Sequence, residues 1–482
     1  MKTHDEETRE FFKHSHVICL LVPHLARSVL IPRLARCVLA PHLAHCAVYT
    51  HHQKCVILDT KDHHGENRKI TAFLGGLDLC DGRYDTPEHR LYRDKDTVFA
   101  DDYSNPSLKK GENGPRQPWH DLHCKIEGQG AYDVLKNFEQ QWLKAINSCK
   151  VRKLYKRLKG MHLEDALVEI EKDPLIASPS TTVPNDHPEQ WHVQIFRSID
   201  SQSQEGFPID LHLIEEQNKL LIDRSIQMAY VQAIRSAQHF IYIENQYFIG
   251  SSFAWPSHRD AGADNLIPIE LTLKIAKAYK LTMQMMYKIV AEEIKSTGLV
   301  DAHPTDYLNF YCLGNREDYD QTSSIEHDSA SAKFRRFMVY VHSKGMIVDD
   351  AYILLGSANI NERSMEGSRD TEIAMGAYQP HHTWPKKKEH PRGQSTLGES
   401  KIAFKDPESL ECVKYVNGVA EDNWKRYTAD EFTRPLQGHI LKYPMEVDVD
   451  GNVKPLAGHE SFPDVGGVVE GCPSLFPHKW TT

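Results

Sequence analysis

Two short apolar runs near residue 350 are separated by a pair of aspartates. Ile347 and Val348 end the first run, and residues 352–355 form the second. Apolar runs on either side of an acidic pair predict a strand, a tight turn and a second strand. His342 and Lys344 stand two residues apart at the start of this segment. Because side chains alternate along a strand, we expect both to point to one face and to bring an imidazole and a fixed cation together.

The same spacing occurs a second time, near residue 52. Both copies have the form His-x-Lys-x-x-x-x-Asp, with His52, Lys54 and Asp59 in the first and His342, Lys344 and Asp349 in the second. Each copy is followed by another apolar run, which ends in Gly-Gly or Gly-Ser. A single His-x-Lys has little weight in a chain with 28 histidines. The alternative is two unrelated hairpins with solvated edges, but two full copies favour a duplicated active-site hairpin.

The remaining apolar pattern predicts helices that alternate with strands. Residues 131–145 and 222–238 have helical spacing, whereas 191–196 and 240–248 have the composition of strands. Strands that alternate with helices are typical of an α/β fold with helices on both faces of a sheet. Together with the duplicated hairpin, this pattern predicts two pseudo-symmetric lobes, each a mixed β-sheet flanked by helices.

Changes in composition suggest how the chain is divided. At 482 residues it is too long for one small domain. Residues 173–189 are rich in Pro, Ser, Thr and Asp and predict a linker. We therefore expect a first half over 1–172, a second half over 190–400 and a C-terminal region over 401–482. Only 51 residues precede His52 and none of them matches the strand at 240–248, so we expect the first half to be truncated at its N-terminal side.

Composition also limits the classes of function. Hydrophobic residues make up 40% and charged residues 26% of the chain, which is typical of a soluble globular protein. The net charge of −10 argues against nucleic-acid binding and against bulk attraction to anionic lipid, so any membrane contact must be local. The ten cysteines form no CxxC pair, which favours a reducing, cytoplasmic setting. The charged first ten residues differ from a signal peptide.

The apolar stretch over 17–49 contains three short repeats. They begin at Pro23, Pro32 and Pro41 and carry arginines between them, which argues against a membrane span. Two interpretations stay open. The repeats form either a basic, apolar patch that touches lipid headgroups or a local expansion in an irregular loop.

The segments around both hairpins resemble the phospholipase D superfamily, and within it the plant phospholipases D, nearest the delta type. Besides the two motifs, the resemblance rests on residues 3–8, 75–87, 116–121, 195–200, 243–248 and 356–380. Measured against that family, the chain lacks the N-terminal C2 domain and has internal deletions near 279–280 and 392–395. The first deletion removes an expected core strand, and its loss leaves neighbouring strands with unpaired backbone groups.

The resemblance implies a phosphodiesterase that works through a covalent intermediate. A phosphodiester resists direct attack, and a phosphohistidine divides the displacement into two easier steps. The resemblance assigns His52 as the nucleophile and His342 as the general acid, which later activates water. The lysines of both motifs are expected to neutralise the non-bridging oxygens. The aspartates of both motifs are expected to orient the imidazoles or to hold the lobe interface.

Further site residues follow from the same resemblance. Ser357 and Asn359 are able to add hydrogen bonds to the phosphate, and Gln246 matches a family position that contacts the phosphatidyl group. His89 and His120 match positions of the family's calcium site, whose acidic partners fall in segments that this chain lacks. Ca²⁺ is thus the cofactor implied, and we expect its site to be incomplete because calcium prefers oxygen ligands.

The expected activity is hydrolysis of phosphatidylcholine, phosphatidylethanolamine or a related glycerophospholipid to phosphatidic acid and the free head group. Transfer of the phosphatidyl group to other alcohols is a further expectation. We expect a cytoplasmic protein with peripheral contact to membrane, the plasma membrane above all. One alternative is a catalytically impaired remnant that binds phosphatidate or a protein partner. A nuclease of the same superfamily is the other, and the acidic composition counts against it.

Overall fold

The computed structural model describes most of the chain between residues 4 and 469. Not described are residues 1–3, 21, 23, 26–47, 62–66, 95–96, 102–103, 109–113, 152–169, 171–175, 177–190, 208–213, 218–219, 252–263, 276–281, 319–328, 380–405, 466–468 and 470–482. Nearly all of the proline repeats, apart from His24 and Leu25, and nearly all of the linker predicted over 173–189 therefore lie outside the described residues. Both expected deletion points also lie outside them.

The described helices and strands follow one another along three parts of the chain. The first half contains α1 (Asp5–Phe12), β1 (His24–Leu25), β2 (Val48–Tyr49), β3 (Cys55–Lys61), β4 (Arg68–Gly75), β5 (Trp119–His120), β6 (His123–Glu127) and α3 (Gln129–Val151). The second half contains β7 (His192–Asp200), β8 (Ile214–Gln217), β9 (Leu220–Arg224), α4 (Ser225–Ser236), β10 (Ile241–Asn245), α5 (Ile267–Ile275), α6 (Thr282–Thr297), the 3₁₀ helix η7 (Pro304–Asp306), β11 (Tyr311–Arg316), α7 (Ala330–Phe334), β12 (Arg336–Met338), β13 (Tyr340–Val341), β14 (Lys344–Val348), β15 (Tyr352–Gly356), α8 (Glu362–Met365) and β16 (Glu372–Tyr378). The C-terminal region contains α9 (Leu410–Thr428), β17 (Ile440–Lys442), β18 (Met445–Val447) and β19 (Val453–Pro455). Among these helices, none has the length and apolar character needed to cross a bilayer.

The largest sheet belongs to the second half and has the strand order β10-β14-β15-β16-β7-β9-β8. It contains the predicted hairpin, in which Asp349 and Asp350 both have φ of 52° between β14 and β15. Two successive left-handed residues match the twist of the flanking strands. The first half carries the smaller sheet β3-β4-β6. The α/β fold and its two lobes are confirmed, but every neighbouring pair in both sheets is antiparallel instead of mixed, because hairpins join several of the strands.

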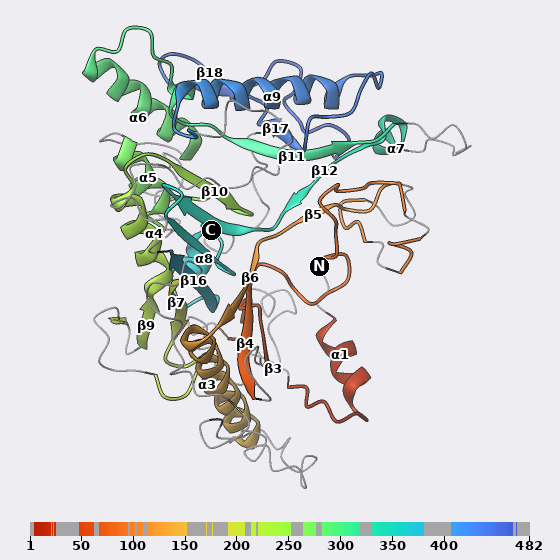
Figure 1. Ribbon diagram of the computed structural model, residues 1–482, viewed down its shortest axis with the longest axis vertical. Coiled ribbons are helices and arrows are strands. Elements are labelled where there is room, and N and C mark those ends of the chain that lie inside the picture. The colour runs from red at the N-terminus through yellow and green to blue at the C-terminus, as the bar shows by residue number, and fades with distance from the viewer. Residues whose placement is uncertain are drawn as a thin grey trace, which may run out of the picture.

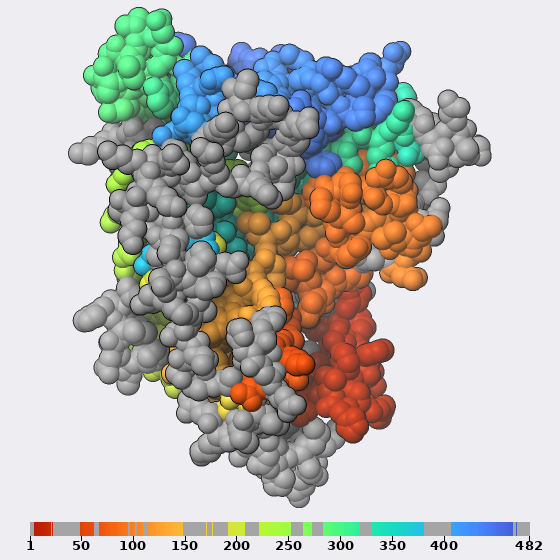
Figure 2. Space-filling view, in the orientation of Figure 1, coloured from red at the N-terminus to blue at the C-terminus, as the bar shows by residue number. Residues whose placement is uncertain are grey.

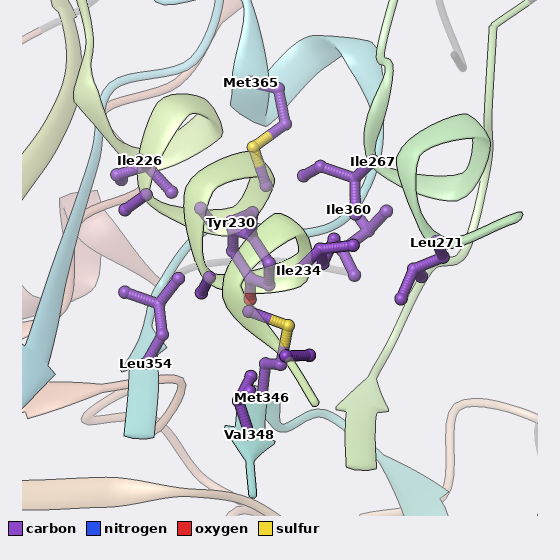
Figure 3. Close-up of a cluster of buried hydrophobic side chains, with 14 of the residues drawn as sticks. Ile226, Tyr230, Ile234, Ile267, Leu271, Met346, Val348, Leu354, Ile360 and Met365 are labelled. Carbon is purple, nitrogen blue, oxygen red and sulfur yellow. The ribbon is translucent and has the colours of Figure 1, made fainter. Parts of the chain in front are cut away.

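Helices cover one face of the seven-stranded sheet. Met346 of β14 and Leu354 of β15 point to this face and meet Tyr230 and Ile234 of α4 (Figure 3). Ile226 lies one turn before Tyr230, so α4 presents a continuous apolar stripe to the sheet. Full burial of such side chains contributes about 1.5–3 kcal/mol each. This core therefore fixes the hairpin that follows the second motif.

The opposite face of the same sheet packs against the first half. Leu355 follows Leu354 and points the other way, where it joins Ile373 of β16. Leu74 of β4 and Ile126 of β6 enter the same cluster from the first half, together with the start of α3. Figure 1 shows β4 and β6 beside the large sheet, away from α4 and α5. The second face is therefore covered by the other lobe, by its sheet together with the start of helix α3.

One end of the seven-stranded sheet is β10. It pairs with β14, and no other described strand pairs with its second edge. Helix α5 ends at Ile275 and α6 begins at Thr282, so two helices follow each other where the resemblance implies a missing core strand.

The C-terminal region packs on the second half through α9 and β17. Strand β17 pairs with β11, which pairs with β12, and α9 lies along this sheet (Figure 1). The buried Arg316 and Arg336 both donate to the carbonyl oxygens of Tyr427 and Ala429 at the end of α9. Arg336 also lies 2.6 Å from the buried carboxylate of Asp464. These bonds satisfy carbonyls that the end of a helix leaves without a partner.

Replacing Arg336 by alanine is expected to destabilise this region strongly. The change leaves the Asp464 side chain, 4% exposed, without its cation, and breaking a buried pair in this way costs about 3–5 kcal/mol. The measurement is the midpoint of urea unfolding followed by tryptophan fluorescence. Arg434→Ala is the control, because its 64% exposed side chain makes only a surface pair with Asp422. Equal midpoints for the two variants would contradict the structural role of Arg336.

Candidate active site

His52 lies just before β3, where the two halves meet. Its backbone N–H donates to the carbonyl oxygen of Thr371 at 2.9 Å. Its Nδ1 lies 2.8 Å from Oε1 of Glu372, which is fully buried at the start of β16. The hydrogen bond at Nδ1 leaves Nε2 for chemistry, and the side chain is 25% exposed. A carboxylate of the second half therefore orients the histidine of the first.

His342 repeats this arrangement in the opposite direction. It follows strand β13, which pairs with β5 of the first half, and its backbone N–H donates to the carbonyl oxygen of His120 at 2.8 Å. Its Nδ1 lies 2.8 Å from Oδ2 of Asp121. In both copies the carboxylate directly follows the residue whose carbonyl binds the histidine amide. Each histidine is thus oriented by the other half, so the site forms only when the halves associate.

Glycines occupy matching positions beside these two carboxylates. Gly75 ends β4 and Gly356 ends β15, and each packs against the residue that follows Asp121 or Glu372. A Cβ at Gly75 or Gly356 would lie 2.3 Å or 2.4 Å from the carbonyl oxygen of that residue. The next backbone amide donates to the same oxygen at 2.9 Å in both halves. The Gly-Gly and Gly-Ser pairs therefore allow a close strand contact that places the carboxylates.

The motif lysines also adopt matching positions. The Nζ of Lys54 donates to the carbonyl oxygen of His52 at 2.6 Å, and Lys344 donates in the same way to His342. Burial is the main reason why the pKa of Lys344 falls to about 7, and nearby Lys54 lowers it further against the opposing effect of Asp121. Two lysines that repel each other in this way are able to share one anion, whose charge would favour their protonated forms.

Burial also decides the protonation of His342. It lowers the pKa of this imidazole, and Lys344 adds to the effect against the hydrogen bond that His342 donates to Asp121. For the Asp121 carboxyl, burial alone would raise the pKa, but His342 and Lys344 together lower it. A neutral imidazole therefore lies beside a charged carboxylate at neutral pH. A bound phosphodiester anion would favour proton uptake by His342.

We call His52, Lys54 and Glu372 the first half-site, and His342, Lys344 and Asp121 the second half-site. Together they supply two oriented imidazoles and two ammonium groups. One imidazole is able to attack a tetrahedral phosphorus while the other exchanges a proton with the leaving group. The ammonium groups are able to stabilise the charge that develops on the non-bridging oxygens.

Comparison with known proteins agrees with this arrangement. A family model for phospholipase D matches residues 1–281 and 277–471. The chain belongs to the phospholipase D family. Phospholipase D delta of Arabidopsis thaliana is 50% identical over 557 residues, which cover 100% of this chain and 64% of the relative. From the same plant, phospholipase D beta 1 is 49% identical over 98% of this chain and 48% of the relative, and beta 2 is 48% identical over 98% and 56%.

The chain spans about half to two thirds of the length of these relatives. The match to phospholipase D delta runs over 557 residues, more than the 482 of this chain. The alignment therefore contains gaps in this chain. Internal segments of the relative have no counterpart here, in agreement with the deletions inferred from the sequence.

In this phospholipase D chain the motif aspartates lie far from the imidazoles. Seven positions of extended chain at about 3.3 Å per residue place Asp59 roughly 20 Å from His52. Asp59 pairs with Arg68 on the neighbouring strand. Asp349 accepts three hydrogen bonds, of 2.7–2.8 Å, from the backbone amides of 238–240 and so holds the connection from α4 to β10. The prediction that these aspartates orient the imidazoles or hold the lobe interface is wrong.

Glu372 and Asp121 take the orienting role, and the sequence reasoning missed both. Each lies at or just before a strand, β16 or β6, that pairs with the last strand of a motif hairpin. An acidic residue at the start of an apolar strand, present once in each half, is the signal that marks them. Their contact with the histidines follows only from the way the two lobes pack.

The three predicted substrate-binding residues have different surroundings. Ser357 is fully buried and donates to Oε2 of Glu372 at 2.5 Å, which places it behind His52 as a support for the carboxylate. Gln246 accepts a hydrogen bond from Lys344 at 2.9 Å and donates to Tyr340 at 2.7 Å, so it lies at the second half-site. Asn359 is 5% exposed, and its buried Oδ1 has no hydrogen-bond partner among the described residues.

The two predicted calcium ligands bind carboxylates instead. Nδ1 of His89 lies 3.0 Å from Asp85, and Nε2 of His120 lies 2.9 Å from Glu244. The hydrogen bond that His120 donates to the Glu244 carboxylate raises the pKa of His120, which favours a charged pair. Within the described parts of the chain, no three His, Cys, Asp or Glu side chains are arranged to hold a metal ion. These side chains therefore do not fit the calcium site that the resemblance implies.

An aromatic stack supports the second half-site. Nε1 of Trp119 donates to Asp121 at 3.1 Å, and its ring stacks on Tyr340 with centroids 4.8 Å apart. The guanidinium of Arg83 lies 3.9 Å from the centre of the Trp119 ring and 3.7 Å from Asp78. Asp78 in turn lies 3.4 Å from the Nζ of the first motif lysine. This series of contacts links the two half-sites through the first-half loop.

Proposed function

We propose that this chain is an active phospholipase D that hydrolyses phosphatidylcholine and related glycerophospholipids, phosphatidylethanolamine among them, to phosphatidic acid and the free head group. The observation that carries the proposal is the reciprocal pair of histidines, each oriented by a carboxylate of the other half. Cytoplasmic action with peripheral contact to the plasma membrane is part of the same proposal. Membership of the phospholipase D family supports the class of reaction.

In the first step, Nε2 of His52 attacks the phosphorus and the bond to the head-group oxygen breaks. His342 gives its proton to that oxygen, so the head group leaves as a neutral alcohol. Glu372 stabilises the positive charge that His52 acquires as the phosphohistidine forms. The lysines of both motifs contact the non-bridging oxygens and stabilise the charge of the transition state.

In the second step, neutral His342 takes a proton from water. The water oxygen attacks the phosphorus, the bond to His52 breaks and phosphatidate leaves. An alcohol in place of water gives phosphatidyl transfer. The lowered pKa of His342 suits a group that alternates between acid and base near neutral pH.

A second candidate function is phosphatidate binding without turnover. The observation that favours it is the second edge of β10, with which no described strand pairs, while Asn245 on β10 pairs directly with Lys344 on β14. Because an edge strand is held from one side only, displacement of β10 would move Gln246 away from this lysine.

The deciding experiment is choline release from phosphatidylcholine vesicles by the purified chain. We expect release by the parent chain and a loss of about 10²–10⁴-fold for His342→Ala, since the change removes the acid of the first step and the base of the second. Parallel reactions with calcium and with a chelator test the cofactor, and plasmid DNA tests the nuclease alternative. Absence of release by a folded chain that still binds phosphatidate vesicles would establish the second candidate instead.

A further inference from the structure

The loop after β4 passes beside both half-sites within three residues. A Cβ at Gly76 would lie 2.1 Å from Oδ1 of Asp121 and 2.9 Å from the carbonyl oxygen of His342. Two residues later, Asp78 lies 3.4 Å from Nζ of Lys54. The backbone at 76–78 is therefore held against the groups that perform the proposed reaction.

The next residue, Leu79, points into solvent with 88% of its surface exposed. Tyr84 and Val98 of the same β4–β5 connection are 58% and 54% exposed. The loop itself is packed against the protein, because Arg83 is only 8% exposed and its guanidinium lies over the ring of Trp119. In Figure 2 the first-half residues that follow β4, in orange, form an exposed side of the molecule between α1 and the C-terminal region. Single exposed apolar side chains are common, but here three lie on the loop that adjoins the active site.

We propose that this loop, residues 76–94 together with Val98, is the anchor that docks the protein on a phospholipid bilayer. Leu79 enters the acyl boundary, and Tyr84 and Val98 extend the apolar contact. The inference rests on the proposed function, since a diacyl substrate stays in the bilayer and the site must reach its phosphate there. Because this loop contacts both half-sites, insertion of its tip into the bilayer places both half-sites at the level of the lipid headgroups.

The charges around Leu79 select the kind of bilayer. Asp78 and Asp81 flank it, with 33% and 63% of their side chains exposed, and the chain carries a net charge of −10. Anionic lipid would repel this loop, whereas zwitterionic phosphatidylcholine would not. Docking is therefore apolar, and we expect it to be insensitive to salt, unlike contacts between exposed charges.

The binding test uses co-sedimentation with pure phosphatidylcholine vesicles, in a His52→Ala background that cannot consume the lipid. Leu79→Asp is expected to weaken binding by roughly 10- to 100-fold, and Leu79→Trp to strengthen it. Val300→Asp is the matched control, because Val300 is 93% exposed beyond the end of α6. Equal binding by the Leu79→Asp and Val300→Asp variants would overturn the proposal, as would binding that requires anionic lipid and is lost in high salt.

The activity test compares two substrates in the otherwise unaltered chain. We expect Leu79→Asp to lose vesicle hydrolysis by about tenfold or more and to keep the parent rate on a monomeric short-chain phosphatidylcholine. Equal losses on both substrates would show that Leu79 supports the site and not the docking. If the parent hydrolyses neither substrate, the proposed function fails, and the vesicle binding of the variants still decides the anchor.

Discussion

Replacing His52 by alanine is expected to lower phosphatidylcholine hydrolysis by about 10⁴-fold or more, since both chemical steps pass through its phosphohistidine. The fold is expected to survive, because the side chain is partly exposed and Glu372 keeps its bonds from Ser357 and Ser364. The measurement is choline release, together with recovery of labelled protein after the reaction, with substrate labelled in the phosphatidyl group, is quenched with denaturant at alkaline pH. We expect an acid-labile labelled protein with the parent chain and none with the variant.

The control for this change is the neighbouring histidine. His51 bonds to Thr371 at 3.1 Å and takes no part in the proposed reaction, so His51→Ala should retain most of the rate. The labelled protein also decides which histidine is the nucleophile. Label that persists in His52→Ala and disappears in His342→Ala would reverse the two roles.

Replacing Glu372 by glutamine is expected to lower kcat by about 10²–10⁴-fold with little change in KM. The amide fills the same space but cannot balance the positive charge on His52, and its N–H₂ group can select the wrong imidazole tautomer. KM is expected to hold because Glu372 is fully buried behind the ring and has no path to the substrate.

Asp59→Asn is the matched control, because it changes the carboxylate that belongs to the motif itself. Its exposed side chain pairs with Arg68 at the far end of β3, so we expect near-parent kcat. A large loss of kcat in Asp59→Asn with a small one in Glu372→Gln would contradict the assignment of the orienting carboxylate.

Several features of the fold could be predicted because they depend on neighbours in the chain. The turn at Asp349 and Asp350 follows from an acidic pair between apolar runs, and the helix expected over 131–145 lies within α3. The strand expected over 191–196 lies at the start of β7. The covering of the large sheet could not be predicted in this way. An apolar pattern on one face of a strand predicts that this face is buried, but it does not predict whether a helix or another sheet covers it.

The sequence by itself determined the parts of the site whose geometry is set within a few residues. His52 with Lys54, and His342 with Lys344, lie two apart on extended chain and therefore share a face. The same extended geometry separates the motif aspartates from the histidines, because each further residue of an extended chain adds about 3.3 Å.

Only the tertiary structure decided which carboxylates serve the histidines. Glu372 is 320 residues from His52, and Asp121 is 221 residues from His342. Their contacts form because two sheets share one apolar core, which brings the start of β16 to the first motif and the short connection between β5 and β6 to the second. Apolar packing is non-directional and brings together residues that are far apart in the chain. The spacing of residues along the sequence therefore cannot predict these contacts.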